Sequence, residues 1–112
     1  MNCLCILAYN EENTIKELLE KYLDYFDLVI VVNDGSLDKT SEIIEKMKNQ
    51  NNKIEVITND KNKGAGYSLQ KALDSFNEKD LDYLVKIDGD NQFEENDILK
   101  LIKYSKNFDF IK

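Results

Sequence analysis

Apolar residues are distributed along this chain in two patterns. Some form short continuous runs, and others recur three or four positions apart in longer stretches. The runs predict buried strands at 2–8, 28–32, 54–58 and 81–87, and the start of a fifth strand at 108–111. The stretches between them predict four amphipathic helices. The residues expected on the inner faces of these helices are Ile15, Leu18, Leu19, Tyr22 and Leu23, then Ile43, Ile44 and Met47, then Leu69, Ala72, Leu73 and Phe76, and finally Ile98, Leu101 and Ile102.

This order of strands and helices is typical of an α/β fold made of βαβ units, with a mostly parallel sheet flanked by helices. The run 28–32 is apolar at every position, as expected of a central parallel strand. A turn is expected at 33–36, and Asp38 is expected to cap the second helix. The 112 residues predict a single domain, 1–112. Because the chain stops at the fifth strand without a closing helix, we expect either a minimal variant or a domain that is truncated at its C-terminus.

The charge and cysteine content exclude some classes of function. A net charge of −7 disfavours nucleic acid as a partner, because such a protein needs a basic face. All 15 basic residues are lysines, so a bound phosphate would be held by lysines, backbone N–H groups or a metal. Cys3 and Cys5 share one face of the first strand and are expected to be buried free thiols. These thiols and the lack of a leader or a span of about 18 apolar residues predict a cytoplasmic protein, with peripheral attachment to a membrane left open.

Four polar clusters follow four successive predicted strands, at 9–12, 33–36, 59–66 and 88–92. In a parallel sheet the carboxyl ends of the strands lie at one edge, and ligands bind in the crevice outside them. Each cluster alone has a simpler explanation as a turn, a helix cap or a close backbone approach. Those explanations do not account for four such clusters at the same edge, which favours a ligand site.

The last of these clusters places Asp88 and Asp90 directly after a buried strand. Hard divalent cations such as Mg²⁺ and Mn²⁺ bind carboxylate oxygens together with the phosphates of a substrate. The pair therefore indicates a metal site, although Asp, Gly and Asn also form ordinary solvated turns.

Taken together, the clusters resemble the N-terminal half of a family 2 glycosyltransferase of the GT-A fold, the group that includes dolichyl-phosphate mannosyltransferases. The family's Ala-Tyr-Asn-Glu-Glu is matched at 8–12, and its Asp-Asp-Gly-Ser is matched at 33–36 with Asn33 in place of the first Asp. Its Asn-x-Gly-x-Gly is matched at 62–66, and its Asp-x-Asp with a following Gln is matched at 88–92. Order and spacing agree over essentially the whole chain.

The resemblance implies an enzyme that binds a nucleotide diphosphate-sugar donor and transfers the sugar to a saccharide or lipid-phosphate acceptor. The residues implied in donor binding are Ala8, Tyr9, Glu11, Asp34, Gly64 and Asp88, and those implied in holding Mn²⁺ or Mg²⁺ are Asp88 and Asp90. Among them, Asp34 would accept a hydrogen bond from the donor's base.

The family places its catalytic base and most of its acceptor site beyond the Asp-x-Asp, so the catalytic residue is left unassigned. A non-catalytic nucleotide-sugar-binding fragment or assembly module is the main alternative. A phosphoacceptor domain is a second alternative, but it needs a lone aspartate at the tip of the third strand, where this chain has Thr58-Asn59-Asp60. A parallel sheet that stops early also leaves an exposed edge, which favours a homodimer or aggregation.

Overall fold

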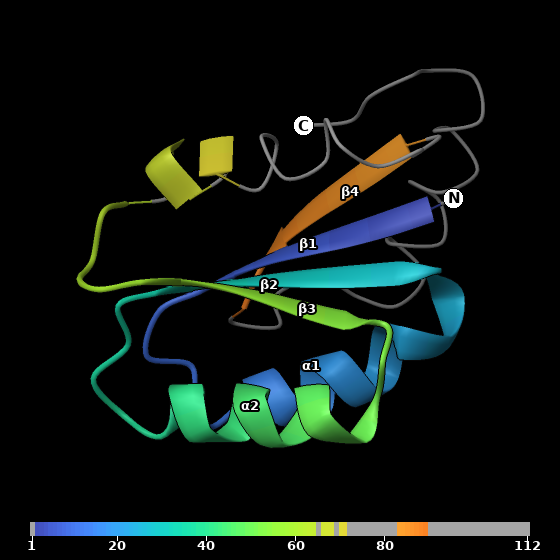
Figure 1. Cartoon of the computed structure of the whole chain (residues 1–112), viewed down its shortest axis with the longest axis horizontal. Helices are drawn as coiled ribbons and strands as arrows, with labels where there is room; N and C mark the ends of the chain where they lie inside the picture. The colour runs from blue at the N-terminus through green and yellow to red at the C-terminus, as the bar shows by residue number, and fades with distance from the viewer. Residues whose placement is uncertain (1, 65, 69, 72–82, 90–112) are drawn as a thin grey trace.

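The computed structural model describes residues 2–64, 66–68, 70–71 and 83–89. Four strands form one parallel sheet in the order β3-β2-β1-β4 (Figure 1). They are β1 (Asn2–Ala8), β2 (Leu28–Asp34), β3 (Ile54–Asn59) and β4 (Tyr83–Asp88). Strand β1 is central, because it is hydrogen-bonded to β2 on one side and to β4 on the other. The expected α/β fold with a parallel sheet is confirmed.

In the described part of the chain, two α-helices cover one face of this sheet (Figure 1). They are α1 (Ile15–Tyr22), which continues into the short 3-10 helix η1 (Leu23–Tyr25), and α2 (Thr40–Gln50). Side chains alternate between the two faces of a strand, so every second strand residue meets the apolar stripes of these helices. The main core consists chiefly of Leu4, Ile6, Ala8, Ile15, Leu18, Leu19, Tyr22, Val29, Val31, Ile44, Met47, Val85 and Ile87.

The opposite face of the sheet carries a second buried cluster. Its members are Cys3, Cys5, Leu7, Leu28, Ile30 and Val32. The described residues of 66–71 lie on this side of the sheet, away from α1 and α2 (Figure 1). With both faces buried, β1 and β2 have the continuous apolar sequence that the periodicity predicts for central parallel strands.

The two thiols are buried and free of a disulfide, as predicted. Burial raises the pKa of Cys5 to about 12, and the nearby Lys86 ammonium opposes this only in part. The Cys5 thiol therefore stays protonated at neutral pH, which leaves it a packing group without nucleophilic character.

Three of the strands run further toward their carboxyl ends than the sequence predicts, and one of them is β4, which ends at Asp88 instead of at position 87. Strand β2 ends at Asp34, so the prediction of a turn at 33–36 was wrong for Asn33 and Asp34, which belong to the strand. Strand β3 likewise includes Asn59. Their parallel pairing accounts for this, since Asn33 is in register with Thr58 and Asp34 with Asn59.

The predicted cap of the second helix was also wrong by one position. Lys39 occupies the N-cap position of α2 and makes no side-chain cap bond. The Asp38 carboxylate instead accepts hydrogen bonds from the backbone N–H groups of Thr40, at 2.9 Å, and Glu12, at 3.3 Å. Asp38 thus joins two loops as well as serving the first turn of the helix.

Several predicted features lie outside the described residues. They are most of the third helix, including Leu69, Ala72, Leu73 and Phe76, the helix with Ile98, Leu101 and Ile102, the strand at 108–111, and the side chains of Asp90 and Gln92. Within the described ranges, no helix has both the length and the apolar character needed to cross a bilayer.

Candidate functional site

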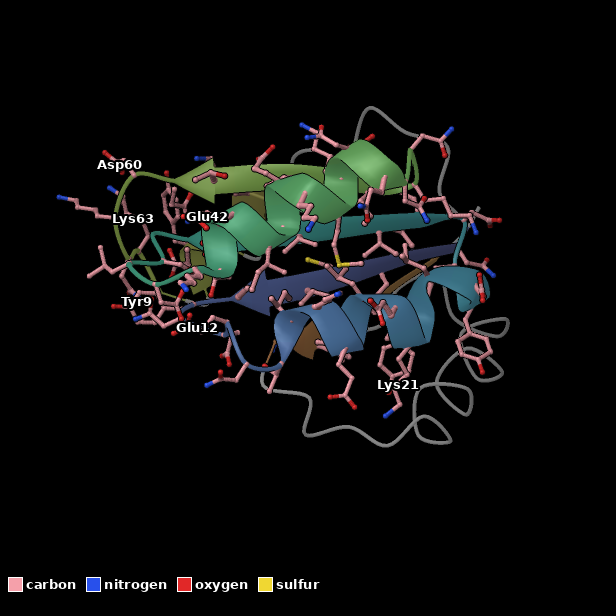
Figure 2. All side chains as sticks on the ribbon, turned by 90° about the horizontal axis from the view of Figure 1, so that it is seen from below. Tyr9, Glu12, Lys21, Glu42, Asp60 and Lys63 are labelled. Atoms are coloured by element: carbon pink, nitrogen blue, oxygen red, sulfur yellow. The ribbon has the colours of Figure 1, made fainter. Side chains whose placement is uncertain are left out.

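The carboxyl ends of β1, β2 and β3 and the residue that follows β4 form one edge of the sheet, called here the carboxyl edge. It carries the loops 9–14, 35–39 and 60–64. Figure 2 shows Tyr9, Glu12 and Lys63 at this edge, whereas Lys21, near the end of α1, lies far from it. The fold therefore brings the described parts of the four polar clusters together.

Hydrogen bonds to the loop after β2 hold the loop after β1 in place. The N–H of Asn10 donates to the Ser36 hydroxyl at 3.1 Å, and the N–H of Glu11 donates to the Thr40 hydroxyl at 2.8 Å. Asn10 also accepts the N–H of Leu37 at 2.8 Å through its side-chain oxygen. These bonds fix Asn10 at a φ of 52°, a region that asparagine tolerates better than most residues.

The residues implied in nucleotide binding differ in exposure along this loop. Ala8 is buried at the end of β1, whereas Tyr9 keeps 40% of its surface exposed. Glu11 is half-buried, and its Cγ lies beside Gly89. Tyr9 is thus the member of this group that is best placed to meet a ligand from solvent.

Of the charged groups that the structure describes at the carboxyl edge, Asp34 is the most enclosed, with 5% of its surface exposed. Its Oδ1 accepts the Lys63 N–H and the Asn59 side-chain amide, both at 2.8 Å, and its Oδ2 accepts the Gly64 N–H at 2.9 Å. Burial alone would raise the pKa of Asp34, but these bonds and one from the Ser68 hydroxyl outweigh it and lower the pKa below its usual value. Asp34 therefore stays ionised and holds the loop 60–64 against the end of β2.

Two glycines permit this close approach of the loop 60–64. Gly35 has a φ of 72°, and a Cβ on it would lie 2.3 Å from the carbonyl carbon of Lys61. The loop backbone therefore occupies the space that any other side chain would need. Gly64 has a φ of 91° with open space around it, so at that position the backbone conformation alone favours glycine.

Next to this loop, two lysines share one aromatic ring. The ammonium groups of Lys63 and Lys71 lie 5.6 and 5.5 Å from the centroid of the Tyr67 ring, within cation–π range. The Lys71 ammonium also donates to the side-chain oxygen of Asn59 at 3.1 Å. These contacts link the start of the 66–71 segment to the end of β3.

At the other side of the site, Gly89 fixes the chain directly after β4. Its N–H donates to the carbonyl of Leu7 at 2.8 Å, and its own carbonyl accepts the Thr14 hydroxyl at 2.7 Å. A Cβ on Gly89 would lie 3.1 Å from Cγ of Glu11 and 3.2 Å from the Leu7 oxygen. The backbone between Asp88 and Asp90 is thereby held against β1 and the start of α1.

Sequence reasoning did not identify Asn59, Thr14 or Thr40 as residues that organise the site. Asn59 was placed in the polar cluster after the third predicted strand, and Thr14 was not singled out. A buried polar residue at the last position of a parallel strand was the available signal, since such a residue needs a hydrogen-bond partner from a neighbouring strand end.

Of the implied metal site, the described residues include the backbone from β4 to Gly89. Strand β4 ends at Asp88, which is in register with Leu7, and the side chains of Asp88 and Asp90 lie outside the described residues. Within the described part of the chain, no three acidic, histidine or cysteine side chains gather around one point. Two carboxylates beside a fixed glycine at a strand end have the oxygen chemistry that suits a hard divalent cation.

Comparison with known proteins agrees with this arrangement. A family model described as glycosyl transferase family 2 matches residues 3–110. A UDP-N-acetylglucosamine–dolichyl-phosphate N-acetylglucosaminyltransferase from Methanococcus voltae is 34% identical, and the match covers 89% of this chain and 45% of the relative. The chain thus spans less than half the length of this curated relative.

Two solved structures share the fold. S. aureus TarS 1–349 in complex with UDP aligns with a TM-score of 0.67 and 26% identity, covering 92% of this chain and 32% of TarS. The mannosyltransferase PcManGT from Pyrobaculum calidifontis, in complex with GDP-Man and Mn²⁺, aligns with a TM-score of 0.72 and 22% identity, covering 88% of this chain and 30% of its own. With the family model matching nearly the whole chain, this protein belongs to glycosyl transferase family 2.

Proposed function

We propose that this chain is the donor-binding part of a metal-dependent glycosyltransferase, which binds a nucleotide diphosphate-sugar for transfer to a saccharide or lipid-phosphate acceptor. The observation that carries the proposal is the carboxyl edge, where Asp34 marks one end of the site and the fixed backbone at Gly89 marks the other. Asp34 and Asp88 are separated by two strand spacings and two residues along the strands. That places their Cα atoms roughly 12 Å apart, so one extended ligand can reach both.

In this proposal, Ala8, Tyr9, Glu11 and Gly64 line the nucleotide pocket, and Asp34 receives an N–H of the base. The four hydrogen bonds already made to Asp34 leave little spare capacity on its oxygens. The Ser68 hydroxyl is the donor that a base can replace, because a hydroxyl can rotate and Ser68 also accepts the Asn59 amide at 3.2 Å. Asp34 would then read the base while it still holds the loop.

At the other end, Asp88 and Asp90 would hold Mn²⁺ or Mg²⁺. A divalent cation there would neutralise the charge that develops on the leaving nucleoside diphosphate. The fixed backbone of Gly89 sets the positions from which the two carboxylates project. PcManGT, a structure of the same fold, is described in complex with GDP-Man and Mn²⁺, which supports the choice of metal.

Titration calorimetry with UDP and GDP tests the proposal. We expect binding in Mn²⁺ that is lost in chelator and in an Asp90→Ala variant, and retained in Asp24→Ala, which removes an equal charge from η1. A charged hydrogen bond contributes about 1.5–3 kcal/mol, so Asp34→Ala should weaken nucleotide binding about tenfold or more while leaving the affinity for free Mn²⁺ unchanged. Equal binding with and without metal would contradict the proposal.

A second measurement separates an enzyme from a binding module. A positioned general base contributes about 10²–10⁴-fold to a rate, and no such base is assigned among these residues. We therefore expect this chain to bind donor and to transfer sugar, or hydrolyse the donor, far more slowly than about 1 s⁻¹. Turnover near that rate with a saccharide or lipid-phosphate acceptor would show that the base lies within these 112 residues.

A further inference from the structure

Asn59 is the last residue of β3, and its side chain makes hydrogen bonds to three other residues of the carboxyl edge. Strand pairing uses only backbone groups and does not require these bonds. The Asn59 side chain is 3% exposed. Its amide nitrogen donates to Asp34 at 2.8 Å and to the Ser68 hydroxyl at 3.2 Å, and its amide oxygen accepts the Lys71 ammonium at 3.1 Å. One planar group therefore joins β2, β3 and the 66–71 segment.

The sheet register makes this arrangement specific. Asp34 and Asn59 are directly paired on adjacent parallel strands, so their side chains project from the same face of the sheet. The amide uses both N–H groups on acceptors that are themselves buried. An apolar side chain at this position would leave Asp34, with only 5% of its surface exposed, with one donor fewer.

We propose that Asn59 is a positioning residue of the nucleotide site, which orients the Asp34 carboxylate so that it can hold the loop 60–64. The effect on nucleotide binding rests on the proposed function, whereas the anchoring of the loop does not. Lys63 and Gly64 donate to Asp34 through their backbone, so the loop is anchored to the same carboxylate that Asn59 holds. A change at Asn59 acts on a ligand only by moving these groups.

Amide hydrogen exchange and calorimetry on an Asn59→Leu variant test the two parts separately. We expect the Lys63 and Gly64 amides to exchange at least about tenfold faster and the UDP or GDP affinity in Mn²⁺ to fall about tenfold, as the loss of a charged hydrogen bond implies. The amides of Val29 and Val31 in the core should keep their protection. A Lys71→Met variant, which removes the ammonium that donates to the Asn59 side-chain oxygen, should leave the loop amides protected.

An Asn59→Asp variant provides a signature that a purely structural defect would not give. The new carboxylate would face Asp34 within hydrogen-bond distance, and two such groups share one proton at a raised pKa. The charged groups around the pair are Lys71, which contacts residue 59, and Lys63 and Asp60 in the adjoining loop. We expect loop protection and nucleotide affinity to be low at about pH 8 and to return toward about pH 5 as the shared proton restores the missing donor.

Each result decides one part of the inference. Unchanged exchange at Lys63 and Gly64 in Asn59→Leu, or no recovery on acidification of Asn59→Asp, would overturn the anchoring role. Faster loop exchange with unchanged nucleotide affinity would overturn the positioning role. Failure of the unsubstituted chain to bind either nucleotide would instead overturn the proposed function, and the exchange data would still decide whether Asn59 anchors the loop. If Asn59→Leu does not fold, the near-isosteric Asn59→Asp variant compared between about pH 8 and about pH 5 supplies the same comparison.

Discussion

The carboxylate of Asp34 is stabilised by N–H and O–H groups rather than by a cation. Its hydrogen bonds from Lys63, Gly64, Asn59 and Ser68 overcome the cost of burial and lower its pKa. No lysine ammonium lies within ion-pair distance of it among the described residues. Within the described ranges, hydrogen-bond dipoles rather than an ion pair therefore stabilise the charge of Asp34.

The lowered pKa of Asp34 predicts how stability depends on pH. A group whose pKa is lower in the folded than in the unfolded chain contributes stability above its unfolded pKa of about 3.9 and loses it as the pH falls through the folded value. Asp34→Asn should therefore reduce the free energy of unfolding by about 1.5–3 kcal/mol near neutral pH, and by less below about pH 4. Urea denaturation of both proteins across this range measures the difference. A constant difference at all pH values would contradict it.

Gly35 offers a second test at the scale of one residue. Its positive φ alone costs a side-chain-bearing residue about 1 kcal/mol, and its added Cβ would overlap the backbone of Lys61. We expect Gly35→Ala to lower stability by more than that and to release the Lys63 amide to exchange. Gly66→Ala is the matched control, because nothing lies within 4 Å of a Cβ at that helical position. Similar effects from both substitutions would show that Gly35 is not needed for the close approach.

Among the elements, the start of α1 and the end of β4 are tied together by a single side chain. The Thr14 hydroxyl donates to the Gly89 carbonyl at 2.7 Å across 75 positions of sequence. The same glycine donates to Leu7, so the segment that follows β4 is held from two sides. The position of α1 is thereby coupled to the position of the proposed metal ligands.

Thr14→Val should uncouple these two elements. Valine keeps the shape of threonine but cannot donate, which leaves the Gly89 carbonyl without this bond at a cost of about 1 kcal/mol in stability. We expect nucleotide binding in Mn²⁺ to weaken, while Thr58→Val on the exposed side of β3 changes neither property. Calorimetry and urea denaturation of both variants provide the comparison. Unchanged nucleotide affinity in Thr14→Val would place the Gly89 segment outside the site.

The elements themselves could be predicted because their information is local. The apolar runs at 28–32 and 54–58 located β2 and β3, and the spacing of residues such as Leu18 and Ile44 located the helices. The carboxyl ends of β2 and β3 could not be located, since Asp34 and Asn59 are typical turn residues when considered singly. Their hydrogen bond joins residues 25 positions apart, and only the register of the sheet shows that they meet.

At the scale of the whole molecule, the strand order places an inner, enclosed strand at the N-terminus. Strand β1 lies between β2 and β4, and its Cys3 and Cys5 are fully buried. A buried, protonated thiol does not react with alkylating or disulfide reagents. We expect both cysteines of the native chain to remain unmodified by such a reagent and to react rapidly in urea. Stoichiometric labelling of the native chain within the mixing time would show that β1 is accessible.

The enclosed thiols of β1 have a consequence for measuring ligands. Because reagent reaches them only after the sheet separates, the labelling rate reports the population of the opened molecule. A nucleotide that binds only the closed molecule lowers that population by the factor 1 + [L]/Kd. The slowing of thiol modification with rising nucleotide concentration would therefore yield the dissociation constant of the unlabelled native chain. Strand β1 thus serves as an internal kinetic probe of whatever occupies the carboxyl edge.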